Sequence, residues 1–247
     1  MAPAEEEEEG PPPGVNHLDD TIQFPKPIRR HFYNRYKLFS KYDDGVWLTD
    51  DAWFGVTPEP LAHKIAQHIS TSCPNNKTQI IDAFCGVGGN VIAFALSGRW
   101  NQIFAIEKDP ATLKCAKHNA KIYGVDKRIH WIEGDCFEIL KKRFSGGYGR
   151  DARVVFGSPP WGGPEYKSDE IFDLDQMQPY GLEQLHTAFS KITSDFVLYL
   201  PRTSDLNQLA KLVPEDQKMQ VTHYCMEGFS KAVCAYFGNF KFESQGV

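Results

Sequence analysis

A glycine-rich segment at residues 82–90 (DAFCGVGGN) is the part of the sequence best suited to hold a nucleotide-like ligand. It joins an apolar stretch typical of a strand (79–84) to a helical pattern (90–97), and glycines there let a ligand approach the backbone. Val91 stands where a dinucleotide turn needs its last Gly or Ala, and the Lys of a P-loop is missing. An acid just before the glycines instead suits the ammonium group of a methionine-like ligand. We therefore expect ligand contacts from Asp82, Phe84, Gly86 and Asn90.

Two further acids follow the next two predicted strands. Glu107 comes after the strand at 102–106, and its carboxylate could accept hydrogen bonds from two ribose hydroxyls. Asp135 follows the strand at 129–133 and could accept from an adenine amino group. Ligands of open α/β sheets bind at the carboxyl ends of the strands, so the three acids together predict S-adenosylmethionine as cofactor. The alternative is that these acids only cap helices.

The fourth predicted strand (153–156) leads into Ser158-Pro159-Pro160-Trp161, a loop suited to methylating a base amine. An exocyclic amine is a poor nucleophile because its lone pair is delocalised into the ring. The Ser158 side chain and the Pro159 carbonyl could accept its N–H groups and direct the lone pair at the methyl group. Trp161 offers a stacking face for the base, and no separate general base is needed. The alternative is a rigid turn with a buried Trp.

The elements around these segments alternate between strands and helices. Helical patterns at 110–123, 136–144, 182–192 and 205–212 separate the strands, and two closing strands (218–225 and 231–237) follow one another without a helix. This order predicts an α/β fold with a doubly wound, mostly parallel seven-stranded sheet and an antiparallel edge. It resembles the class I (Rossmann-like) methyltransferase fold.

The ends of the chain suggest three parts. Residues 1–20 are acidic and proline-rich, and we expect them to be disordered. Residues 21–72 are rich in aromatic and charged residues and predict a small helical accessory lobe, in which Thr57 caps a helix running to about Ser70. Residues 73–247 would form the methyltransferase core.

Charge and cysteine usage narrow the possible partners. The net charge is −5, but residues 1–20 carry seven acids and no Lys or Arg, so the remainder is close to neutral. That suits a ligand with a few phosphates better than a long duplex. The six cysteines show no CxxC pair and the histidines no HxxxH pair, so we expect no metal and no disulfide framework. No apolar stretch approaches membrane-spanning length and the N-terminus is unlike a signal peptide, so we expect no membrane association.

The longer motifs resemble one family, the trimethylguanosine synthases, which are RNA cap guanine-N2 methyltransferases. The resemblance runs from about residue 31 to 238. It is carried by residues 82–90 and by SPPWGGPEY at 158–166, and also by YDDG at 42–45, WFGVTPE at 53–59 and Leu200-Pro201-Arg202. Glu107 departs from the pattern, because an Asp is common there, but both acids can bind a ribose diol.

The resemblance implies two successive methyl transfers to N2 of 7-methylguanosine, giving 2,2,7-trimethylguanosine and S-adenosylhomocysteine. The partners would be capped small nuclear and nucleolar RNAs, with RNP proteins as further candidates. It implies a monomer in the nucleus or nucleolus, with the cytoplasm as a further location.

The resemblance also implies site residues. Trp161 would stack on the methylated base, whose positive charge adds a cation–π contribution, and Ser158 and Pro159 would face N2. Asn119 and Arg202 would approach the cap phosphates, helped by a basic residue of the lobe: Lys37, with Arg35 and Lys41 as the other candidates. Phe54 and Thr57 would lie near the cofactor.

Two other functions remain open from the sequence. One is an amino methyltransferase acting on an internal adenine or guanine of RNA or DNA, although such loops more often read Asn-Pro-Pro or Asp-Pro-Pro. The other is a catalytically silent cap-binding module, against which the intact cofactor turn and its three acids argue.

Overall fold

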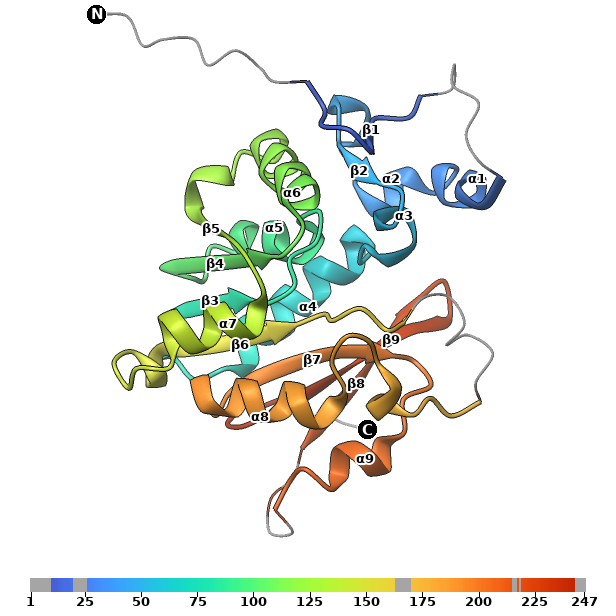
Figure 1. Ribbon diagram of the computed structural model, residues 1–247. Helices are drawn as coiled ribbons and strands as arrows, with labels where there is room; N and C mark the ends of the chain where they lie inside the picture. The colour runs from blue at the N-terminus through green and yellow to red at the C-terminus, as the bar shows by residue number, and fades with distance from the viewer. Residues whose placement is uncertain (1–9, 20–25, 163–169, 215–216, 218, 243–247) are drawn as a thin grey trace, which may run out of the picture.

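The computed structural model describes residues 10–19, 26–162, 170–214, 217 and 219–242 (Figure 1). Its main sheet has seven strands. The strands β3, β4, β5, β6 and β7 run parallel to one another, while β9 is antiparallel to both β7 and β8. In spatial order the strands are β5 (Ile129–Glu133), β4 (Gln102–Glu107), β3 (Gln79–Asp82), β6 (Arg153–Gly157), β7 (Phe196–Pro201), β9 (Phe229–Phe237) and β8 (Gln220–Met226). The predicted sheet and its antiparallel edge are confirmed.

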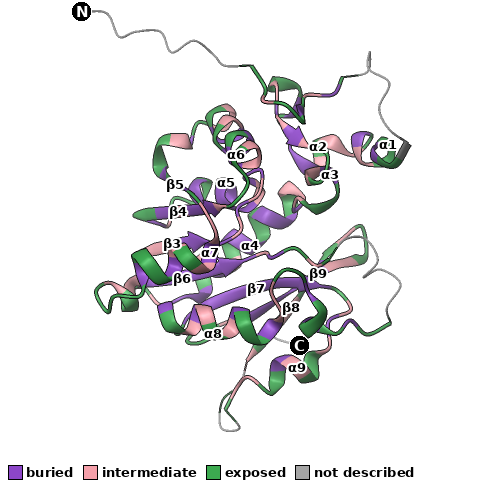
Figure 2. Ribbon diagram, in the orientation of Figure 1, coloured by how far each residue is buried: buried purple, intermediate pink, exposed green. Residues whose placement is uncertain are grey.

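Helices cover both faces of this sheet (Figure 1). Successive strand residues point to opposite faces, so Ile80 packs with α4, α5 and α6, whereas Ile81 packs with α7 and α8. Figure 2 shows the central strands β6 and β7 buried along their length, as expected for parallel strands covered on both sides. The helices are α4 (Glu59–Ser72), α5 (Gly89–Leu96), α6 (Pro110–Ile122), α7 (Cys136–Ile139), α8 (Leu182–Ile192) and α9 (Leu206–Ala210).

A small lobe precedes α4. It contains β1 (Val15–Asn16), α1 (Lys26–Phe32), α2 (Arg35–Leu38), β2 (Leu48–Thr49) and α3 (Ala52–Gly55). Three aromatic side chains that are at most 1% exposed form its centre: Phe32, Tyr42 and Trp53. The sequence predicts a lobe that extends to residue 72, but α4 lies in the helix layer of the sheet because its apolar face packs against α5.

Part of the expected N-terminal disorder is not found. Residues 1–9 and 20 lie outside the described residues, but Val15 and Leu18 are buried and β1 pairs antiparallel with β2. The Tyr42 hydroxyl donates to the Leu18 carbonyl and accepts from its N–H. The burial of Val15 and Leu18, the pairing of β1 with β2 and the two bonds to Tyr42 together attach this segment to the lobe.

Candidate active site

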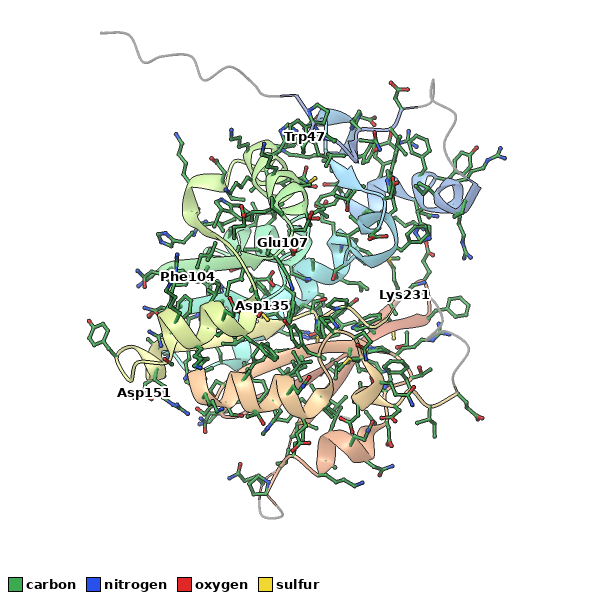
Figure 3. All side chains as sticks on the ribbon, in the orientation of Figure 1. Trp47, Phe104, Glu107, Asp135, Asp151 and Lys231 are labelled. Atoms are coloured by element: carbon green, nitrogen blue, oxygen red, sulfur yellow. The ribbon has the colours of Figure 1, made fainter. Side chains whose placement is uncertain are left out.

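The carboxyl ends of four parallel strands bring the predicted site residues to one edge of the sheet. Asp82 is in register with Ala105 of β4 and Phe156 of β6, and Glu107 is in register with Glu133 of β5. Glu107 and Asp135 both lie at this edge (Figure 3). The loop from Ser158 begins directly after β6, so the cofactor turn, the acids and the amine-binding loop converge as the sequence predicts.

The glycine turn has the backbone that a ligand cradle needs. Gly86 has φ +54° and Gly88 has φ +102°, a region that side chains with a Cβ rarely adopt. A Cβ on Gly86 would meet no atom within 4 Å, so open space lies beside the turn. A Cβ on Gly89 would instead lie 3.0 Å from Val56 Cγ2, because the segment before α4 packs directly on the turn.

Asp82 and Asn90, which flank the glycines, carry buried acceptors that lack a partner among the described residues. Asp82 is 0% exposed, and while its Oδ1 accepts from Phe84 N at 3.3 Å, its Oδ2 has no hydrogen bond. Asn90 Oδ1 has none either, although Asn90 Nδ2 donates to Thr57 Oγ1 at 2.9 Å. Unpaired buried acceptors cost free energy unless a ligand supplies donors, and an ammonium group would do so. The residues present therefore fit the methionine end of the expected cofactor.

Burial controls the ionisation of Asp82. Removal from water raises its pKa to about 8; the bond from Phe84 N acts in the opposite direction, and the neighbouring Glu107 adds to the rise. Burial also raises the pKa of Glu107. An arriving cation would stabilise the charged form of Asp82.

Glu107 and Asp135 each combine a structural role with spare acceptor capacity. Glu107 Oε2 accepts from Gly86 N at 3.0 Å, and Oε1 accepts from the N–H groups of Lys108 and Asp109 at 2.9 and 3.0 Å. Asp135 caps α7 through Oδ1, which accepts from Phe137 N at 3.0 Å and Glu138 N at 3.4 Å. The helix-capping alternative is thus correct for one oxygen of Asp135, but its Oδ2 faces side chains instead.

The loop after β6 is anchored to the neighbouring strand. Pro159 is buried, Ser158 is partly exposed, and the half-buried Trp161 donates from Nε1 to the Tyr199 carbonyl at 3.3 Å. The Trp161 and Tyr199 rings lie 5.6 Å apart at 31°. Residues 163–166 of the motif lie outside the described residues. Trp161 is therefore fixed at one edge while its ring is not fully buried.

Thr57 and Phe54, the two lobe residues expected near the cofactor, lie in different surroundings. Thr57 is buried against the turn through Asn90, so it does not cap α4, whose first turn begins after Pro58 without a side-chain cap. The predicted helix cap is therefore wrong, because the Thr57 hydroxyl is used in a long-range contact. Phe54 is 45% exposed on α3 and meets His31 edge-on at 4.9 Å.

Asn119 does not lie where the resemblance implies. It is 0% exposed, and its Nδ2 donates to the carbonyls of Trp47 at 2.9 Å and Val87 at 3.0 Å, while Oδ1 accepts from Trp47 N at 2.8 Å. Both amide hydrogens are used and the side chain is closed to solvent, so it does not bind cap phosphates here. It instead fastens the lobe to the glycine turn.

The basic candidates lie at the surface except for Arg35, whose side chain is only 13% exposed. Arg202 is exposed just beyond the end of β7, at the same edge as the β6 loop. Lys37 Nζ pairs with Glu227 in the turn between β8 and β9. Arg35 packs over the Phe32 ring at 4.2 Å, and Lys41 Nζ donates to the Ile122 carbonyl at 3.1 Å. Lys37 is thus paired with a surface carboxylate that a phosphate could replace.

Comparison with known proteins connects this site to a family. The model of the RNA cap guanine-N2 methyltransferases matches residues 77–240, which include the cofactor turn and the β6 loop. The chain belongs to this family. It is therefore a cap guanine-N2 methyltransferase, which disfavours both an internal-base enzyme and a silent binding module.

Two curated relatives extend the match beyond the core. The chain is 38% identical over 215 residues to the trimethylguanosine synthase of Schizosaccharomyces pombe, covering 86% of this chain and 87% of that protein. It is 35% identical over 228 residues to that of Saccharomyces cerevisiae, covering 88% and 71%.

Solved structures are similar in fold alone. A putative methyltransferase from Porphyromonas gingivalis has a TM-score of 0.58 at 15% identity and covers 87% of this chain and 51% of its own. A putative O-methyltransferase from Klebsiella pneumoniae has a TM-score of 0.52 at 13% identity and covers 88% and 92%.

The site of this cap methyltransferase contains one further residue, Tyr180, that no sequence motif indicates. The Tyr180 hydroxyl donates to Asp135 Oδ2, which Lys108 Nζ also approaches at 3.7 Å. A tyrosine in a loop carries no local signal of such a contact. Among the described residues no group of three or more His, Cys, Asp or Glu could hold a metal, and no helix is long and apolar enough to cross a membrane.

Proposed function

We propose that the protein uses S-adenosylmethionine to methylate N2 of 7-methylguanosine in RNA caps twice, giving 2,2,7-trimethylguanosine and S-adenosylhomocysteine. The observation that carries this proposal is the position of the Ser158–Trp161 loop. It leaves β6 at the sheet edge where Asp82, with its unpaired acceptor, ends the neighbouring strand β3. A methyl donor and a base amine would therefore be held on adjacent strands.

Within the site each group has a separate task. Asp82 and Asn90 would hold the ammonium end of the cofactor, Glu107 the ribose and Asp135 the adenine amine. When bound, the cofactor supplies an electrophilic methyl group on a sulfonium sulfur.

The loop prepares the nucleophile. Trp161 would stack on the cationic base, while the Ser158 hydroxyl oxygen and the Pro159 carbonyl accept from the N2 hydrogens and orient its lone pair. N2 would accept the methyl group that the cofactor supplies, S-adenosylhomocysteine would be the leaving product, and the methylated amine would lose its proton to solvent. One N–H remains after the first transfer, so a second is possible; after it none is left, which ends the sequence at two.

Lys37 and Arg202 would contact the cap phosphates, and the proposed substrates are capped small nuclear and nucleolar RNAs. We also propose a monomer that resides in the nucleus or nucleolus, with the cytoplasm as a further location and RNP proteins as further partners. Fractionation and sedimentation of the native protein would test these points.

The decisive test is mass spectrometry of the products formed from 7-methylguanosine triphosphate. We expect a dimethylated main product, a monomethylated intermediate, and little reaction with unmethylated GTP. Accumulation of the monomethylated product alone would contradict the double transfer. Labelling of internal bases without transfer to the cap analogue would contradict the substrate.

A further inference from the structure

Tyr180 lies just before α8 and has no task in the proposed reaction, yet it reaches across to the cofactor edge. Its hydroxyl donates to Oδ2 of Asp135, 45 residues earlier in the chain. Its ring stacks on Phe137 with centroids 4.1 Å apart at 27°, and it lies 6.3 Å from the Phe84 ring. Tyr180 is partly exposed, so the ring has a path to solvent.

These contacts involve the oxygen that the cofactor would need. Asp135 Oδ1 is committed to the first N–H groups of α7, so Oδ2 is the oxygen available to an adenine amine. A tyrosine offers the same features as adenine, namely a flat ring and a donor in its plane. Bound adenine and Tyr180 in its present position would compete for Asp135 Oδ2 and for the aromatic rings of Phe137 and Phe84 beside it.

We propose that Tyr180 occupies the adenine end of the cofactor site in the cofactor-free protein and has to release Asp135 before the cofactor binds. This rests on the proposed function, because it takes Asp135 as the adenine acceptor. A site that must first open binds with an apparent affinity lowered by the fraction of molecules that are open. The bond from the Tyr180 hydroxyl to Asp135 therefore lowers the affinity for the cofactor, even though Tyr180 lies beside the cofactor site.

The test is the Kd for S-adenosylhomocysteine, measured by calorimetry on the full chain and on two variants. Tyr180→Phe keeps the ring but loses the bond to Asp135, and we expect its Kd to fall about five-fold, the worth of one such hydrogen bond. Tyr180→Ala also removes the stack on Phe137 and should bind at least as tightly as the wild type. Unchanged or weaker binding by Tyr180→Phe, or weaker binding by Tyr180→Ala, would overturn the proposal. Tyr180 would then be a part of the site that stays in place when the cofactor binds.

A matched control is Tyr148→Phe, because Tyr148 is 95% exposed and its side chain contacts none of the site residues that the structure describes. Its Kd should equal that of the wild type, and melting curves of all variants would establish that they fold. If the wild type failed to bind S-adenosylhomocysteine, the cofactor assignment itself would be wrong. If it bound and Tyr180→Phe gained nothing, only the role of Tyr180 would be wrong.

Discussion

Trp161 is the residue on which substrate binding should depend most. Its indole N–H is bound to the Tyr199 carbonyl, so the ring is held in one orientation and loses little freedom when a base stacks on it. We expect Trp161→Ala to abolish measurable transfer to 7-methylguanosine triphosphate, with a loss of stacking worth about 1–3 kcal/mol and a further loss of orientation.

The comparison that isolates this role is cofactor binding. The Kd of Trp161→Ala for S-adenosylhomocysteine should stay within about two-fold of the wild type, because Trp161 acts on the base. Trp161→Phe should retain part of the activity. Near-normal turnover by Trp161→Ala would refute stacking on this side chain.

Asp82 should make cofactor binding depend on pH. Its pKa of about 8 in the free protein means that it is protonated below that pH, whereas an ammonium group needs the carboxylate. Binding then releases a proton, so the Kd for S-adenosylhomocysteine should fall as pH rises, by up to about ten-fold per unit, and level off above pH 8.

Asp82→Asn is the matched control because it keeps the shape but cannot ionise. It should bind weakly at every pH and lose the slope. A pH-independent Kd in the wild type would show that Asp82 does not hold the ammonium group.

Among the elements, α6 has an unexpected function in fixing the lobe. Asn119 on α6 bonds both polar backbone groups of Trp47, just before β2, and the Val87 carbonyl in the glycine turn. Asn119→Ala leaves these groups unpaired, so we expect a loss of about 1–3 kcal/mol in the free energy of unfolding, measured with a chemical denaturant.

Kinetics on the same variant separate this role from a phosphate contact. If Asn119 holds the lobe to the glycine turn, Asn119→Ala should lower the stability of the protein and also weaken cofactor binding, because the glycine turn becomes less ordered. A higher KM for the cap analogue with unchanged stability would restore the phosphate contact that the sequence implied. Asn119→Asp keeps the acceptor for Trp47 N but sets a carboxylate oxygen against the carbonyls of Trp47 and Val87, so we expect it to lose at least as much stability as Asn119→Ala.

At the scale of the whole molecule, the lobe and the β8–β9 turn are joined by the ion pair of Lys37 and Glu227. Both side chains are well exposed, at 41% and 61%, so the pair adds little to stability, and its interest lies in competition for a phosphate. Glu227→Gln frees Lys37, so we expect a KM for 7-methylguanosine triphosphate that is several-fold lower at low salt.

Lys37→Met should change the same KM in the opposite direction, and added salt should reduce both effects. Steady-state kinetics at two salt concentrations would measure them. The same KM in both variants and the wild type would exclude a phosphate contact by Lys37.

The sheet, the order of its elements and the edge that carries the chemistry could all be predicted from the order of residues. Hydrophobic periodicity and turn residues are local signals, and the carboxyl ends of parallel strands must meet at one edge of a sheet. The sequence therefore predicts that Asp82, Glu107, Asp135 and Ser158 lie together. The motifs were long enough to identify the family.

The hydrogen-bond partners of side chains far apart in the chain depend on how the elements pack, and could not be predicted in the same way. Thr57 could have capped a helix but bonds Asn90; Asn119 could have faced a phosphate but is buried against Trp47. Tyr180 gave no signal, because its partner Asp135 is brought near only when the loop before α8 packs over α7. A hydroxyl or amide bonds whichever group packing brings within about 3 Å, and no local pattern encodes that choice.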